Sequence, residues 1–271
     1  MARVVANSIP KSGTHLLDRL LVLLGFRMVE GGIRPHLVAG RYGSVRRLLR
    51  GRGEKVTVGV VSPQLISRRW LARRLAKVPH GAFVNAHCIY SPELATLFVQ
   101  QGMRTVCILR DPRDVAVSQM HFIKERKQHF AHEGYMSLPS DHERLMLSIR
   151  GGELGGRELQ PLDQRYRQFL RWGQEGGAVM VKFEDLVGIK GGGSAEAQRE
   201  AVERVGRHLG IGVGQERMRA VEEGLFGVGR TFRKGQIGGW REEFSSEHER
   251  AVEGVVGPLL VELGYEAPPN S

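Results

Sequence analysis

Short apolar runs and longer segments with an apolar stripe alternate along the chain. The short runs predict β-strands at residues 4–6, 56–61, 82–87, 104–110 and 178–183. The longer segments predict helices at residues 16–24, 62–79, 195–209, 215–225 and 247–264, with further helices beginning near residues 91 and 114. This alternation predicts an α/β fold, in which helices flank both faces of a central, mostly parallel sheet.

Side chains that follow the predicted strands indicate where a ligand would bind. Lys11, His87, Arg110 and Phe183 each lie at or just after the end of such a strand. Because ligands of open parallel sheets bind beyond the carboxyl ends of the strands, we expect these four residues to meet at one site. Residues 126–165 are polar and irregular, and we expect them to form a lid or a pocket wall.

Composition indicates a globular protein with a full core. The 271 residues are 41% hydrophobic and 25% charged, and we predict a single domain over residues 1–271. No basic and apolar leader is apparent, so we expect no signal peptide. The two cysteines, Cys88 and Cys107, suggest neither a disulfide framework nor a zinc site. We therefore expect a reducing cytoplasm as the compartment.

Positive charge is concentrated in one part of the chain. The formal net charge is +11, and residues 27–80 hold thirteen Lys or Arg residues against two acidic ones. Such a block attracts nucleic acid, an acidic lipid surface or an acidic substrate, although it can equally be a solvated face. The predicted helix at 62–79 is basic and amphipathic, so it either touches a membrane surface or packs on the core.

A lysine lies in the turn between the first predicted strand and the first predicted helix. The turn reads Pro-Lys-Ser-Gly-Thr-His at residues 10–15, with Gly13 permitting a sharp bend and Thr14 at the helix start. Free N–H groups and the helix dipole make such a helix start an anion site, and phosphate is the usual ligand. The nucleotide P-loop has its lysine after the last glycine, whereas Lys11 precedes Gly13, so an ATPase or GTPase is disfavoured.

Three stretches in order resemble the sulfotransferase family that uses 3′-phosphoadenosine 5′-phosphosulfate (PAPS). PKSGTH at 10–15 resembles the family's 5′-phosphosulfate loop, and VCILRDPRDVAVSQMHF at 106–122 resembles its 3′-phosphate motif. FRKGQIGGWREEF at 232–244 resembles its C-terminal RKGxxGDW segment. The resemblance covers nearly the whole chain and implies a single-domain, P-loop NTPase-like sulfotransferase fold.

The resemblance also implies roles for individual residues. Lys11 and His87 would be catalytic, Lys11 at the bridging oxygen of the donor and His87 as the base that deprotonates the acceptor. Phe183 would contact adenine, with a core position as the alternative. Lys11 would also bind the donor at its sulfate side. The 5′-phosphate would be held by Ser12, Gly13, Thr14 and His15, and the 3′-phosphate by Arg110, Ser118, Arg233, Lys234 and Gly235. For Arg110 the alternative is a salt bridge with Asp111 or Asp114.

Three positions depart from the family pattern. Leu16 replaces the tryptophan that stacks on adenine, Gly239 replaces the aspartate before Trp240, and Asn85 replaces the lysine two residues before the catalytic histidine. These departures affect how the donor packs more than the assignment itself.

Sulfuryl transfer needs a cation near the leaving oxygen and a base near the acceptor, and it requires no metal. We expect PAPS as donor, PAP as product and no metal ion. The expected acceptor is a small molecule, a glycan or a lipid, with an acidic one favoured by the basic block. No nucleic acid is expected, peripheral membrane contact is open, and the oligomeric state is not predicted. The alternatives are a nucleotide kinase with an atypical phosphate loop and a non-catalytic nucleic-acid-binding protein.

Overall fold

The computed structural model describes residues 1–33, 53–154, 156–227 and 236–268. The chain forms two compact units, each assembled from two stretches of sequence. The first unit comprises Met1–Leu109 with Gln168–Gly235, and the second comprises Arg110–Arg167 with Gln236–Ser271. The single domain predicted over 1–271 stays a prediction.

A five-stranded parallel sheet forms the centre of the first unit. Its strands lie in the order β2 (Arg27–Met28), β5 (Ala82–Ala86), β1 (Arg3–Ser8), β6 (Met103–Leu109) and β9 (Val179–Lys182). In the register of the three middle strands, Asn7 of β1 pairs with Ala86 on one side and Cys107 on the other. Because these strands are parallel, the residues that follow β1 and β5 emerge at the same edge of the sheet.

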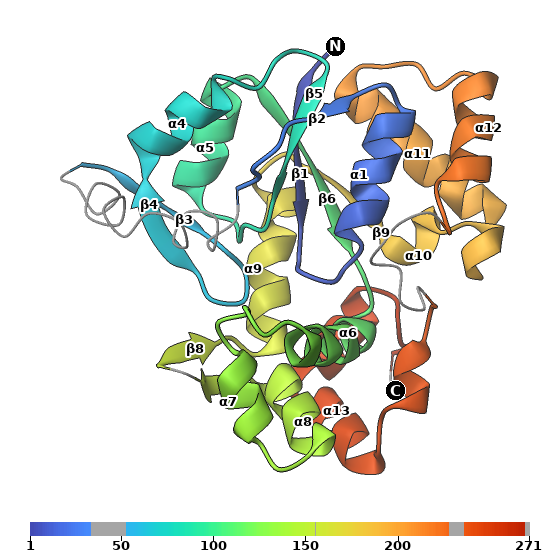
Figure 1. The fold of residues 1–271 in the computed structure, drawn as a ribbon. Helices are drawn as coiled ribbons and strands as arrows, with labels where there is room; N and C mark the ends of the chain where they lie inside the picture. Colours follow the sequence, from blue (N-terminus) through green and yellow to red (C-terminus); the bar gives the residue numbers. More distant parts are fainter. Residues whose placement is uncertain (34–52, 155, 228–235, 269–271) are drawn as a thin grey trace. The chain divides into compact units, whose positions relative to one another are not determined.

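Helices cover both faces of this sheet, as predicted. Figure 1 shows α1, α11 and α12 on one side and α4 and α5 on the other. Their bounds are α1 (Thr14–Leu23), α4 (Arg68–Leu75), α5 (Pro92–Gln100), α10 (Phe183–Leu186), α11 (Ala195–Leu209) and α12 (Gln215–Gly224), with the 3₁₀ helix η1 (Ile189–Gly191) between α10 and α11. The apolar stripes of α1, α11 and α12 enter one core with side chains of β1, β5, β6 and β9. Burial of these apolar side chains is the main favourable term for the unit.

The prediction of one helix over 62–79 is wrong. Gln64–Ser67 form strand β4, which pairs antiparallel with β3 (Lys55–Val58), and only Arg68–Leu75 are helical. Ser67 ends the strand and caps the helix, since its side chain accepts a hydrogen bond from the amide of Trp70 at 3.3 Å. The apolar residues Leu65 and Ile66 therefore belong to the hairpin and not to a helical stripe.

The second unit is mainly helical and contains most of the segment predicted to be irregular. Residues 126–154 and 156–165 contain two helices, a hairpin and the first turn of a third helix, so the prediction of irregular structure is wrong. Their role as a lid or a pocket wall stays a prediction. The elements are α6 (Pro112–Glu125), α7 (His132–Ser137), α8 (Asp141–Arg150), β7 (Gly152–Leu154), β8 (Arg157–Leu159), η2 (Gly239–Glu242) and α13 (Ser246–Glu262), and α9 (Leu162–Gln174) runs from this unit into the first. In the residues described, no helix is both long enough and apolar enough to cross a membrane.

Candidate active site

The loop between β1 and α1 has an unusual backbone. Lys11 has φ of 75°, and it is the one non-glycine residue with positive φ among the residues described. A side chain in this region costs about 1–3 kcal/mol, and such strain persists where the surrounding structure imposes it. Gly13 follows with φ of 108° and is the N-cap of α1. The chain thus turns sharply at the lysine and then enters the helix directly.

The first turn of α1 is well suited to an anion. It contains no acidic residue and has no side-chain cap, whereas α5, α6 and α8 each have both. The amide groups at a helix start need acceptors, and the helix dipole favours a negative one. The geometry therefore agrees with the predicted phosphate loop, whose lysine precedes these amides.

Ser12 ties this loop to the sheet. The residue is fully buried, and its hydroxyl lies 2.8 Å from the carbonyl of Ile9 and 3.0 Å from that of Ile108 on β6. Its amide donates to Ile9 as well, at 3.1 Å. These bonds give Ser12 a structural role in the loop, and its contact with a phosphate stays a prediction.

Phe183 lies beside the loop as part of the core. It is 5% exposed, and a Cβ placed on Gly13 would come within 2.8 Å of its ring and 2.9 Å of Ile108. A glycine is therefore needed at position 13 both for its backbone angle and for this close packing. The core position considered for Phe183 is confirmed, and the adenine contact stays a prediction.

His87 is bound to the residue that ends β1. Its Nδ1 lies 2.9 Å from the backbone carbonyl of Ser8 and 3.0 Å from the Ser8 hydroxyl, which in turn lies 2.8 Å from the hydroxyl of Thr14. A carbonyl oxygen only accepts hydrogen bonds, so Nδ1 must carry the proton. In the neutral ring the lone pair is then on Nε2. Ser8 thus connects the predicted base to the first residue of α1.

Asn7 fixes the chain just after His87, and its role was not predicted. This fully buried side chain donates to the carbonyl of Cys88 at 3.0 Å and accepts from the Cys88 amide at 2.9 Å. Trp172 donates to the same carbonyl at 2.9 Å. Two polar residues, Asn7 and Ser8, at the end of an otherwise apolar strand were the signal in the sequence that this strand supports a site.

Asn85 and His15 both lie near Asp18, a largely buried residue of α1. The Asn85 amide donates to Asp18 at 2.6 Å, and His15 Nδ1 lies 3.8 Å from the same carboxylate. The residue that replaces the family's lysine is therefore turned toward α1. His15 itself is exposed, with 67% of its side chain accessible, and its part in binding the 5′-phosphate stays a prediction.

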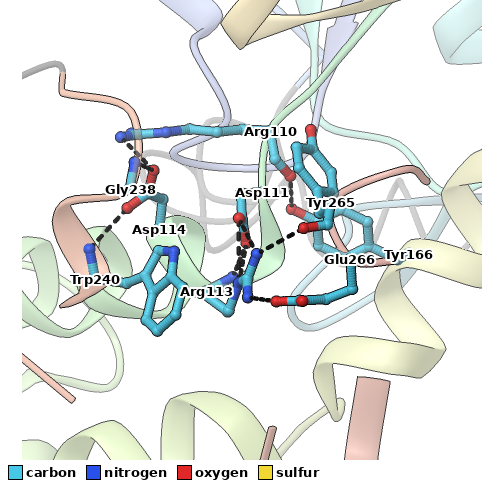
Figure 2. A network of polar contacts seen from close by, with 9 residues as sticks. All are labelled: Arg110, Asp111, Arg113, Asp114, Tyr166, Gly238, Trp240, Tyr265 and Glu266. Atoms are coloured by element: carbon cyan, nitrogen blue, oxygen red, sulfur yellow. Dashed lines mark hydrogen bonds and ion pairs between the residues drawn. The ribbon is translucent and has the colours of Figure 1, made fainter. Parts of the chain in front are cut away.

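The second unit contains Arg110, which follows β6 directly in the chain. Figure 2 shows its guanidinium beside Asp114, at 3.3 Å from Oδ2, so the alternative of a salt bridge with Asp114 is confirmed. The same Nη2 donates to the carbonyl of Gln236 at 2.9 Å. Asp114 also accepts from the amides of Gly238 and Trp240, each at 3.0 Å. Burial raises the pKa of the Asp114 carboxyl above its usual range, although Arg110 and the two amides act to lower it.

A second ion pair lies next to the first. Arg113 donates from Nε to Oδ1 and from Nη2 to Oδ2 of Asp111, and it also pairs with Glu266 beyond α13 (Figure 2). Its guanidinium carbon lies 4.2 Å from the centre of the Trp240 ring. Burial acts to lower the pKa of the Arg113 guanidinium, but its bonds to the two carboxylates reverse this and raise it. We call this group of residues the Arg110 network: Arg110, Asp111, Arg113, Asp114, Gln236, Gly238, Trp240 and Glu266.

The remaining predicted site residues are placed less fully. Ser118 is half-buried on α6, one turn after Asp114. Arg233, Lys234 and Gly235 lie outside the described residues. The loop of Lys11 lies near His87 through Ser8 and Thr14, and near Phe183 through Gly13. Arg110 and Ser118 belong to the second unit, so the meeting of Lys11, His87, Arg110 and Phe183 at one site stays a prediction. Over the described ranges, no group of three or more His, Cys, Asp or Glu side chains could hold a metal ion.

The chain is similar to one protein family over nearly its whole length. The sequence profile of the sulfotransferase domain matches residues 2–264, which confirms the resemblance inferred from the three motifs. No match is found among curated proteins.

Solved structures agree in fold. Mouse sulfotransferase SULT7A1 complexed with PAP is 16% identical, with 97% of this chain and 87% of that chain covered and a TM-score of 0.62. Retinol dehydratase in complex with androsterone and inactive cofactor PAP is 17% identical, with 95% and 80% covered and a TM-score of 0.57. Retinol dehydratase in a complex with retinol and PAP is 18% identical, with 98% and 83% covered and a TM-score of 0.57. The predicted fold class, a parallel sheet flanked by helices as in P-loop-like sulfotransferases, is confirmed.

Proposed function

Because the chain belongs to the sulfotransferase family, we propose that it transfers a sulfuryl group from PAPS to a hydroxyl or amine of an acceptor. The observation that carries this proposal is the placement of the phosphate loop and His87 at the ends of the neighbouring strands β1 and β5, joined through Ser8. A kinase would share a phosphate loop, but it has no evident use for a histidine whose Nδ1 is bound to that loop's first strand.

In this proposal the loop stabilises the leaving group. Negative charge grows on the bridging oxygen as the bond between that oxygen and sulfur breaks, and its electron pair stays with PAP. Lys11 and the first amides of α1 would be fixed in place before the reaction, because the bonds of the buried Ser12 hydroxyl to Ile9 and Ile108 hold the loop and keep Lys11 in its strained conformation. Charges fixed in advance stabilise a transition state more than mobile ones.

His87 would act as the general base. The acceptor gives its proton to Nε2 of His87 while the acceptor oxygen or nitrogen forms its bond to sulfur. The other ring proton stays on Nδ1 and donates to the Ser8 carbonyl, which also stabilises the imidazolium that results. A histidine suits this step at neutral pH because its ordinary pKa is about 6.5.

The acceptor is proposed only by class. The retinol dehydratase structures contain the small molecules androsterone and retinol, and we propose a small-molecule, glycan or lipid acceptor here. The exposed Arg69 and Arg73 of α4, and Lys77 just after it, support an anionic acceptor or an anionic membrane surface that presents one. Both cysteines are free and buried, which supports a reducing compartment such as the cytoplasm.

Thermal unfolding with PAP, and separately with ATP and magnesium, tests the donor. A ligand at 100 times its dissociation constant stabilises a protein by about 2.7 kcal/mol, so a shift is readily measured. A rise with PAP alone is expected, and a rise with ATP and magnesium alone would favour the kinase.

A substitution of His87 tests the base. His87→Ala is expected to abolish transfer from PAPS and leave PAP affinity nearly unchanged, because the histidine acts on the acceptor. His80→Ala, which removes an exposed histidine of the same unit, is the control and should keep full activity. Loss of PAP binding in His87→Ala would make His87 a donor-site or structural residue instead.

A further inference from the structure

Asp114 has more contacts than its place in the sequence suggests. Its side chain is 2% exposed, and its two oxygens receive donors from three different residues. Oδ1 accepts from the Trp240 amide, and Oδ2 accepts from the Gly238 amide and pairs with Arg110 (Figure 2). Two of these donors are main-chain groups that lie 124 and 126 residues further along the chain.

Arg110 holds the same segment from its other side. Its Nη2 donates to the carbonyl of Gln236 while it pairs with Asp114. The arginine and the aspartate therefore fix residues 236–240 by three main-chain bonds, and the ion pair joins the two side chains. Charge-assisted bonds of this kind are about twice as strong as neutral ones.

The family resemblance assigns Arg110 to the 3′-phosphate. One buried carboxylate thus orients the predicted phosphate ligand Arg110, both directly and through the main chain of residues 236–240. Without such a role, a carboxylate next to a phosphate site would repel the phosphate and weaken its binding.

We propose that Asp114 is a positioning residue for the donor's 3′-phosphate, and that it sets the preference for PAP over adenosine 5′-phosphate (AMP). This inference rests on the proposed function, because it needs PAP to be the nucleotide bound. PAP and AMP differ only in the 3′-phosphate, so the ratio of their affinities isolates this effect. Asp114 touches neither the sulfur nor the acceptor in this scheme, and it acts through Arg110 and residues 236–240.

Asp114→Asn tests the proposal because it keeps the shape and removes the charge. An asparagine has one acceptor oxygen where the aspartate has two, so either the Trp240 amide, or Arg110 together with the Gly238 amide, must face an NH₂ group. PAP affinity is expected to fall about tenfold or more, the loss typical of one charge-assisted bond, with AMP affinity unchanged. If the carboxylate only repelled phosphate, PAP affinity would rise, and that result would overturn the proposal.

Asp163→Asn is the matched control. Asp163 also lies in the first turn of a helix and pairs with an arginine four residues away, but that pair is exposed. The Asp163→Asn substitution changes the net charge by the same amount as Asp114→Asn and should leave the ratio of PAP to AMP affinity unchanged. Equal loss of both nucleotides in Asp114→Asn would also overturn the proposal, because it would indicate general damage.

Amide hydrogen exchange without nucleotide separates this inference from the proposed function. Exchange at Gly238 and Trp240 is expected to accelerate in Asp114→Asn, and no change there would overturn the inference at its first step. Wild-type protein that binds no PAP would overturn the donor proposal, and the inference with it, whatever the exchange result.

Asp114→Glu keeps the charge and shifts the oxygens, so it should also lower the PAP preference. If neither variant folds, the carboxylate is structural and the positioning role is wrong.

Discussion

The phosphate loop and the Arg110 network present two ways of building a site for negative charge. The loop is made of consecutive residues, and its polar bonds are local or run to the adjacent strands β5 and β6. The Arg110 network joins residues that are more than a hundred positions apart, through buried ion pairs and main-chain amides. The loop depends on backbone shape, whereas the network depends on paired charges.

This difference has an energetic consequence. Backbone shape is lost when one glycine is replaced, and the cost is steric. A buried charge network is lost when one partner is removed, because the remaining charge stays buried without compensation. Changes at the two regions should therefore differ in size, in pH dependence and in tolerance of conservative replacements.

Removing Arg113 should produce the largest effect and break the network. In the wild type, the side chains of Arg113 and Asp111 are each less than a tenth exposed. Arg113→Met leaves the Asp111 carboxylate buried beside an apolar side chain. We expect a loss of about 3–5 kcal/mol in the free energy of unfolding, measured by denaturant titration. Arg207→Met removes an exposed ion pair with Glu203 and should change stability by less than about 1 kcal/mol. A similar small change in both variants would contradict the buried network.

Replacing Gly13 should break the loop by steric means. In Gly13→Ala the new Cβ meets Phe183 and Ile108, and the backbone keeps a φ of 108° that alanine rarely adopts. We expect a cost of about 2–4 kcal/mol, from about 1–2 for the left-handed backbone and the rest for overpacking, together with weaker PAP binding. Thermal and denaturant unfolding with and without PAP measure both effects.

Gly102→Ala is the control for the loop. Gly102 also has positive φ, but a Cβ there would have no neighbour within 4 Å. Gly102→Ala should lower the free energy of unfolding by about 1–2 kcal/mol and leave PAP binding intact. Equal losses in the two variants would mean that the contact with Phe183 and Ile108 does not matter.

The same contrast explains which parts of the molecule could be predicted from sequence. The loop and the strands β1, β5, β6 and β9 were predicted because apolar runs and their flanking turns are local patterns. Residues 126–165 were not, because short helices in a polar stretch take their stability from packing that no local period records. The helix predicted at 62–79 was wrong for a related reason: Leu65 and Ile66 suit a helix stripe or a hairpin equally.

The supporting residues of the site were the hardest to predict. Asn7 and Ser8 act on main-chain groups of distant residues, and a main-chain amide or carbonyl has no sequence signature. Asp114 was considered as an ion-pair partner of Arg110, but its bonds to Gly238 and Trp240 cross more than a hundred residues. Such contacts depend on how the chain returns to α6, which local patterns do not encode.

A smaller effect is expected from Ser8, and it sharpens the description of the loop. Ser8→Ala removes the hydroxyl that links His87 to Thr14 and keeps the carbonyl that fixes the tautomer. One neutral hydrogen bond is worth about 1 kcal/mol, so we expect kcat to fall about fivefold with little change in the KM for PAPS. Ser8→Thr restores a hydroxyl and should recover most of kcat. No recovery, or a change in KM alone, would show that Ser8 does not orient the base.

The smallest effect concerns pH and the second unit, where His248 completes the capping box of α13. His248 Nδ1 accepts from the Ser245 amide at 3.0 Å, so protonation at Nδ1 would break this bond of the capping box of α13, while the Ser245 hydroxyl would still accept from the His248 amide. Burial lowers the pKa of His248 below its usual range; nearby His142 acts in both directions, and Glu247 and Glu143 act to raise it.

The sign of the pH effect follows from this lowered pKa. The unfolded chain binds the proton more readily, so the contribution of His248 to stability is complete above the ordinary pKa of about 6.5 and is lost as pH falls through the lowered folded-state value. His248→Gln keeps an acceptor for Ser245 and should flatten the loss of stability between neutral and mildly acidic pH. His80→Gln, at an exposed position, should leave the slope as in the wild type. Unfolding free energies measured across this range would contradict the cap if His248→Gln kept the wild-type slope.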